Sequence, residues 1–250
     1  MTKDNLKNAE RDFHAVFSSC GLTIPVPVSM HRFGLLHLHY LSLENWFSYL
    51  ISEHSRLLFG GFDVSDGRTK YLLGSFWKKY QVAHGDHWVF SNHTDELNKC
   101  IPYYLHLDEG TGQRKSGVLV FNMQSLWGLD TKTKFERAFH GNLGRSDEDF
   151  EDYMTRSQCH NQSGSSFLSR FLYTIVPKKW YSKKFSFVYD KVLEKLAAES
   201  RKLASTGVKG WYPICLGVKG DAPALAKAAH YTRSFLNLPI KKSNLFFWAL

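Results

Sequence analysis

The segment spanning residues 101–129 constrains the fold more than any other part of the sequence. In its first part apolar and polar residues alternate, with Tyr103, Leu105 and Leu107 on the apolar side. A polar, glycine-containing loop follows over residues 108–116, and residues 117–123 are again rich in strand-forming residues. Because a period of two is typical of half-buried strands, the segment predicts a hairpin. Its loop is longer than a tight turn, which leaves room for a functional role.

The remaining segments predict helices and one further strand. Apolar residues at helical spacing indicate helices over residues 43–59 (capped by Ser42), 68–83, 166–176 and 185–204, with partial helix over 130–165. Residues 211–218 form an apolar run typical of a strand, after which a helix is expected to begin at Asp221. This order predicts an α/β or α+β fold in which crossover helices join the strands of a mixed sheet.

Length and composition suit a folded protein of one large or two small domains. The chain has 250 residues, of which 43% are hydrophobic. We divide it into a helical N-terminal region over 1–99, a sheet-bearing core over 100–237 and a divergent tail over 238–250. No apolar run approaches the about 18 residues of a membrane span, and no signal peptide is evident, so an intracellular location is expected. The four scattered cysteines fit reduced thiols.

Two aspartates follow predicted strands and are candidate metal ligands. Asp108 follows the first strand of the hairpin, and Asp221 follows the strand over 211–218. If these strands are neighbours in one sheet, both carboxylates emerge at the same edge and would bind Mg²⁺ or Mn²⁺, which prefer oxygen ligands. Metals held in this way activate a nucleophile and stabilise the leaving oxygen in phosphoryl transfer. The ordinary alternatives are a helix cap for Asp221 and a solvated loop acid for Asp108.

The order of these features is that of a ribonuclease-H-like core: an acidic strand end, a hairpin, intervening helices and a second acidic strand end. Other chemistries lack their motifs. Gly110-Thr-Gly112 is too short for a phosphate-binding loop, and no serine elbow is present. His37 and His39 alternate as on one face of a strand, without a further partner at zinc-site spacing.

Positive charge indicates a polyanionic partner. The formal net charge is +9, and lysines alternate with aromatic residues in one segment: Lys178, Lys179, Trp180, Lys183 and Lys184. Arg114 and Lys115 add charge in the hairpin loop. Cations that contact phosphates beside rings that stack on bases are typical of nucleic-acid binding, and DNA is the expected partner. The alternative is a solvated turn whose aromatic side chains face the core.

Four stretches resemble a group of transposon-like proteins expanded in dinoflagellate genomes: "LLFGGF", "SFWKKYQVAHGDHWVFSNH", "IPYYLHLDEGTGQRKSGVLVF" and "WYPICLGVKGDAPALAKAAHYTRSFLN". The resemblance runs from Leu35 to Asn237. Its DEGTG and KGDAPAL blocks are in turn similar to blocks of eukaryotic cut-and-paste transposases that carry an acidic triad. This similarity implies a ribonuclease-H-like core in which Asp108 and Asp221 match the first two acids.

After Asn237 the sequence departs from that group, and neither a third acid nor a cysteine-bound zinc is expected. The resemblance therefore implies a truncated transposase-like domain, ancestrally a metal-dependent enzyme of DNA cleavage and strand transfer, inactive alone and located in the nucleus. The alternative is a non-enzymatic nucleic-acid-binding or interaction module that uses the basic aromatic segment. Whether the chain is an enzyme stays open at this point.

Overall fold

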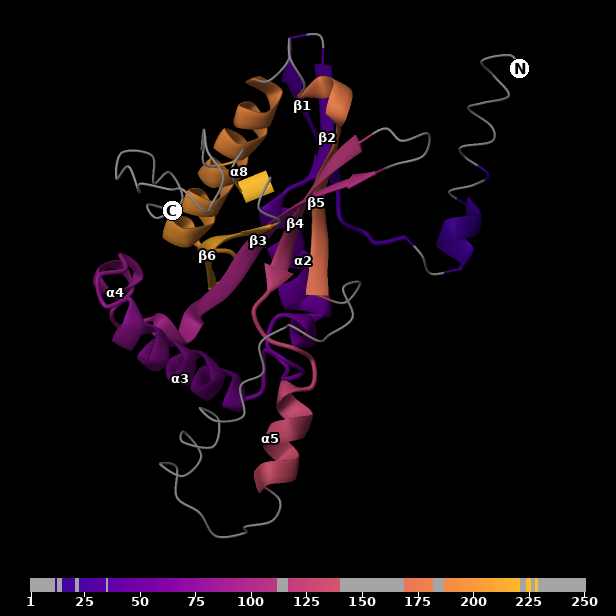
Figure 1. Cartoon of the computed structure of the whole chain (residues 1–250). Coiled ribbons are helices and arrows are strands. Elements are labelled where there is room, and N and C mark those ends of the chain that lie inside the picture. The colour runs from indigo at the N-terminus through magenta and orange to yellow at the C-terminus, as the bar shows by residue number, and fades with distance from the viewer. Residues whose placement is uncertain are drawn as a thin grey trace.

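The structure is a computed structural model, and it describes residues 12, 15–20, 23–34, 36–111, 117–139, 169–181, 187–220, 224–225 and 228. It has a mixed α/β architecture, in which helices pack around a four-stranded mixed sheet and a two-stranded hairpin lies beside it (Figure 1). The strands are β1 (Val28–Phe33), β2 (Leu36–Leu41), β3 (Cys100–Thr111), β4 (Gly117–Ser125), β5 (Arg170–Pro177) and β6 (Tyr212–Gly220). The helices are α2 (Leu43–Glu53), α3 (Arg68–Ala83), α4 (Val89–Asn92), α5 (Thr131–Phe139) and α8 (Phe187–Thr206). Short 3₁₀ turns are η1 (Ser55–Leu57), η2 (Leu97–Lys99) and η4 (Lys178–Trp180).

The main sheet has the strand order β5-β4-β3-β6. β3, β4 and β5 form an antiparallel meander, whereas β6 pairs with β3 in parallel. Parallel neighbours require a crossover connection, and α8 lies in the connection between β5 and β6. The crossover helix runs from Phe187 to Thr206, and Gly207, with a positive φ of 68°, ends it.

One face of the sheet is buried beneath α2 and α8. Tyr103, Leu105 and Leu107 of β3 point to this face and are almost fully buried. The ring of Phe47 on α2 meets the ring of Tyr103 at 5.1 Å between centroids. On the same side, the Trp46 indole Nε1 donates to the carbonyl oxygen of Leu172 on β5 at 2.7 Å. A single hydrophobic core therefore contains residues from both the N-terminal region and the sheet.

The opposite face is covered only in part by the described residues. Near the start of β3, the Trp77 indole on α3 donates to the Cys100 carbonyl oxygen at 3.0 Å, and Figure 1 shows β3 beginning beside α3 and α4. Further along the strands most side chains on this face are exposed or half-buried, whereas Gln124 is buried. We call it the open face and define it by Tyr104, His106 and Asp108 of β3, Asn122, Val120 and Gln124 of β4, and Arg170, Leu172 and Ile175 of β5.

Several predicted elements are confirmed. The expected helix over 68–83 is α3 with the same limits, and the long helix is α8. The predicted hairpin is β3–β4, and the later strand is β6. His37 and His39 lie on β2, which agrees with the strand alternation of this segment, so the N-terminal region contains a hairpin as well as helices.

The helix expected over 43–59 is shorter than predicted. Ser42 caps α2 as expected, because its hydroxyl accepts a hydrogen bond from the Asn45 amide at 3.2 Å. The helix ends at Glu53, since His54 leaves the helical conformation with a φ of −140°. The hydroxyl of Ser55 then accepts a hydrogen bond from the Val64 amide at 3.0 Å, which stabilises a 3₁₀ turn in place of a further helical turn.

The helix expected over residues 166–176 was wrong, because residues 170–177 form strand β5. Its aromatic and β-branched residues suit a strand, and Phe171, Tyr173 and Val176 are buried. A short apolar run fits either structure by periodicity, and pairing with β4 decides between them. The described range of the segment over 130–165 contains α5, and residues 140–165 lie outside the described residues. Beyond Asp221, which also lies outside them, residues 224, 225 and 228 are helical, as predicted.

Candidate metal and nucleic-acid site

Asp108 lies within β3, three residues before the strand ends at Thr111, and its side chain is exposed on the open face. The prediction of a loop over 108–116 is therefore corrected: β3 and β4 continue to pair as far as Thr111 and Gly117. Within the described ranges, no hydrogen bond or ion pair engages the Asp108 carboxylate. Its oxygen atoms are thus available to a ligand that approaches the open face.

The parallel pairing of β3 with β6 determines which residues are neighbours near Asp108. The last described pair in this register is Leu107 with Gly220. A Cβ atom on residue 220 would lie 2.5 Å from the Leu107 carbonyl oxygen, so only glycine permits this approach of the two backbones. Asp108 and Asp221 each follow this pair by one residue in the sequence, although Asp221 itself lies outside the described residues.

Glu109 belongs to a different cluster on the other side of β3, because successive side chains of a strand point to opposite faces. Its carboxylate accepts hydrogen bonds from the Lys178 ammonium at 2.8 Å and from the Tyr181 hydroxyl at 3.3 Å. Burial, with a smaller contribution from the Glu109 charge, raises the pKa of Tyr181 to about 12. These contacts attach η4 to the end of the hairpin and leave Asp108 outside the cluster.

The basic aromatic segment is described only in its first part. Lys178 pairs with Glu109, Lys179 is exposed, and the half-buried Trp180 packs against the hydrophobic core. For Trp180 the structure matches the interpretation in which the aromatic side chains of this turn face the core. Four further predicted nucleic-acid contacts lie outside the described residues: Lys183, Lys184, Arg114 and Lys115.

A row of side chains across the open face was not predicted from the sequence. The Lys219 ammonium of β6 lies 3.8 Å from the centroid of the Tyr104 ring on β3. Tyr104 pairs with Gln124 of β4, and Gln124 pairs with Arg170 of β5. Burial, and then the Arg170 charge, lower the pKa of Lys219. The alternation of residues 103–108 indicates that Tyr104 lies on the same face of β3 as Asp108. The neighbours of Tyr104 in this row come from other strands that are distant in sequence, so the sequence does not indicate them.

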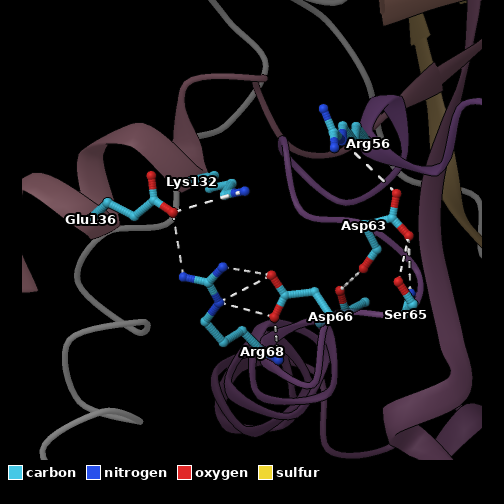
Figure 2. A network of polar contacts seen from close by, with 8 residues as sticks. Arg56, Asp63, Ser65, Asp66, Arg68, Lys132 and Glu136 are labelled. Carbon is cyan, nitrogen blue, oxygen red and sulfur yellow. Dashed lines mark hydrogen bonds and ion pairs between the residues drawn. The ribbon is translucent and has the colours of Figure 1, made fainter.

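A cavity of about 990 Å³ lies between α2, η1 and the start of β5. Its apolar lining includes Trp46, Leu50 and Phe171, and charged side chains such as Arg56 and Asp63 line it as well. Figure 2 shows that these two charged residues lie close to a network that connects the start of α3 to α5. In this network Arg68 pairs with Asp66 at 2.6 Å and with Glu136 at 3.4 Å, and Lys132 lies 3.8 Å from Glu136.

A carboxylate such as that of Asp108 suits a hard divalent cation by its donor chemistry. Across the described ranges, no group of three or more His, Cys, Asp or Glu side chains has the arrangement of a metal site. The second predicted ligand, Asp221, lies outside those ranges, so the fit to a metal rests on the Asp108 carboxylate and on the register of β3 with β6.

Comparison of the chain with the models of known families, with curated proteins and with solved structures finds no match. In the parts of the chain that are described, no helix has both the length and the apolar character needed to cross a bilayer.

Proposed function

We propose that the chain is a transposase-like domain with a ribonuclease-H-like core and that its ancestral chemistry is metal-dependent cleavage and strand transfer of DNA. The order of elements supports the proposal: an antiparallel meander of three strands, a crossover helix and a fourth strand parallel to the first. The single observation that carries it is the parallel pair of Leu107 and Gly220, because Asp108 and Asp221 are the residues that follow this pair in the sequence.

Asp108 and Asp221 would hold the metal, Mg²⁺ or Mn²⁺, through their carboxylate oxygens. When bound, such a metal supplies Lewis-acid stabilisation of the leaving oxygen and lowers the pKa of an attacking water or hydroxyl group. The chain's own residues position the ligands: the close approach of Leu107 and Gly220 keeps the end of β6 beside β3 at the residue before Asp108. The exposure of Asp108 leaves it accessible to a nucleic-acid strand on the open face.

The resemblance matches two acids, Asp108 and Asp221, to an acidic triad. We propose that a site of these two carboxylates binds the metal weakly and does not complete strand transfer alone. Because the proposed substrate is DNA, the same proposal includes a nuclear location.

A calorimetric titration of the protein with Mn²⁺ tests the metal site directly. We expect Asp108→Asn and Asp221→Asn each to weaken Mn²⁺ binding by about tenfold or more, since even an outer-shell partner is worth that much. The matched control is Asp95→Asn, which removes an exposed carboxylate elsewhere and should bind Mn²⁺ as the wild type does. Equal Mn²⁺ affinity of the wild type and Asp108→Asn would remove Asp108 from the site.

The second candidate is a nucleic-acid-binding module without chemistry. The net charge of +9 and the exposure of Lys179 favour it. It predicts salt-dependent binding of DNA or RNA that weakens when Lys178, Lys179, Lys183 and Lys184 are changed together to alanine. Absence of binding at low salt would reject this candidate, whereas binding without any Mn²⁺ effect would favour it over the first.

A further inference from the structure

Two cations lie on one row of the open face, and no carboxylate of the described residues lies between them. The row runs from Lys219 on β6 to Tyr104 on β3, Gln124 on β4 and Arg170 on β5. Directly paired residues of neighbouring antiparallel strands share a face, so Tyr104, Gln124 and Arg170 are on the same side of the sheet. Because the Lys219 ammonium lies over the Tyr104 ring, Lys219 is on that side as well.

The electrostatics of this row favour a bound anion. The Arg170 charge is close enough to Lys219 to contribute to the lowering of its pKa, in addition to burial. Among the residues that the structure describes, neither cation forms an ion pair, although Arg170 also lines the cavity beside α2. Two like charges that approach each other repel, and an anion bound between them would remove the repulsion.

The row also has a definite position relative to Asp108. Tyr104 and Asp108 lie on the same face of β3, four residues apart, which corresponds to roughly 13 Å at the rise of a strand. One strand of a duplex carries a phosphate about every 3.4 Å along the helix axis, so the separation corresponds to roughly four nucleotides. If the reacting phosphate of a DNA strand lies at Asp108, a phosphate about four nucleotides away on the same DNA strand therefore lies at the row.

We propose that Lys219 and Arg170 bind a non-reacting backbone phosphate of a nucleic-acid strand that crosses the open face toward Asp108, with Tyr104 positioning Lys219. The choice of nucleic acid as the ligand rests on the proposed function. Arg170 brings a planar guanidinium suited to bidentate contact with phosphate oxygens, whereas Lys219 acts as a point charge. Ile175, whose side chain is 48% exposed, and Val120 provide apolar surface for sugar or base along the same face.

The test is equilibrium binding of fluorescent DNA oligonucleotides, single-stranded and duplex, to the full chain in EDTA at several salt concentrations. We expect Lys219→Gln and Arg170→Gln each to weaken binding about threefold to tenfold and to reduce the slope of log K against log salt by about one. Because both cations contact the same phosphate, the double variant should also reduce the slope by about one and should weaken binding at least as much as either single variant. The matched control is Lys191→Gln on α8, where the wild-type lysine pairs with Glu194. This substitution should change the affinity for DNA less than about twofold.

Two further variants separate charge from folding. Lys219→Arg keeps the cation and should retain wild-type affinity, and Tyr104→Phe keeps the ring and should do the same, whereas Tyr104→Leu should weaken binding as Lys219→Gln does. Competition by inorganic phosphate at millimolar concentration, with no preference for DNA, would show a free-phosphate site and overturn the nucleic-acid assignment.

The results also distinguish this inference from the proposed function. Unchanged affinity and salt slope in the double variant would overturn the inference even if Mn²⁺ binds at Asp108. Loss of DNA binding in the double variant, without any Mn²⁺ binding to the wild type, would support the row and reject the metal site. Failure of the wild type to bind DNA at low salt would overturn the inference outright.

Discussion

The hydroxyl of Tyr103, in the middle of β3, donates a hydrogen bond of 2.9 Å to the hydroxyl of Ser200 on α8. Ser200 in turn donates to the Leu196 carbonyl oxygen of its own helix at 2.9 Å. Both side chains are buried, and burial raises the pKa of Tyr103 well above its usual value of 10.0. The bond therefore joins the central strand of the sheet to its crossover helix inside the core.

Removal of the Ser200 hydroxyl and removal of the Tyr103 hydroxyl leave different polar groups in the core. Among the described residues, Ser200→Ala leaves the buried Tyr103 hydroxyl with the Cys215 thiol, a weak partner, and should cost about 1–3 kcal/mol of unfolding free energy. Tyr103→Phe leaves Ser200 bonded to Leu196 and should cost about 1 kcal/mol. Urea unfolding of both single variants and the double variant measures the difference. A smaller loss for Ser200→Ala than for Tyr103→Phe would contradict this account.

Gly220→Ala should destabilise the fold at the candidate site. Its Cβ would lie 2.5 Å from the Leu107 carbonyl oxygen, so β3 and β6 must separate, and we expect a loss of about 1–3 kcal/mol. Gly74→Ala is the matched control, because Gly74 lies inside α3 with open space around its Cβ position. There the same substitution should stabilise the protein by about 0.5–1 kcal/mol. In urea unfolding, the changes in unfolding free energy of the two variants should have opposite signs.

The Asp66–Arg68 pair should make stability depend on pH in the acid range. The hydrogen bond from Arg68 holds the pKa of Asp66 below its usual value of 3.8. The pair therefore stabilises the folded chain above about pH 4, and its contribution, on the order of 1 kcal/mol, is lost as pH falls through the lowered pKa. Asp66→Asn should remove this dependence, as measured by urea unfolding at pH 7 and pH 3. Asp130→Asn, at an exposed pair with Lys134, should change it less.

Residues 100–250 should not fold without residues 1–99. Phe47 of α2 is fully buried against Tyr103, and the Trp46 indole bonds to β5. Phe47→Ala should cost about 3–5 kcal/mol, whereas Val82→Ala, at a side chain 90% exposed, should change stability by less than about 0.5 kcal/mol.

Deletion of residues 1–99 should abolish cooperative thermal unfolding. A cooperative transition in that shortened chain would show that the core region is independent.

Periodicity was sufficient for the elements whose pattern is long or regular. α3 and α8 carry several helical turns of apolar residues, and β3 alternates over enough positions for a strand to be recognised. β5 is a short apolar run that fits either structure, and its pairing with β4 is a tertiary property that no local pattern contains. The polar residues after Asp108 predicted a loop, whereas pairing with β4 extends the strand through them.

The candidate site was predictable only where one strand supplies it. Asp108 could be singled out because it follows an apolar alternation in the sequence. The Lys219–Arg170 row could not, because its four members come from four strands and their proximity depends on the strand order. The composition around Trp180 suits both stacking on bases and packing against the core, and Trp180 packs against the core.

The parallel pairing of β3 with β6 also has a kinetic consequence. β3 and β4 are close in sequence and can pair as soon as both are synthesised, whereas β6 joins β3 only after a connection on the order of a hundred residues has closed. Pairs so distant in sequence form slowly. The neighbourhood of Asp108 is therefore completed late in folding, and the slowest refolding phase should report the arrival of β6 at the edge of the meander.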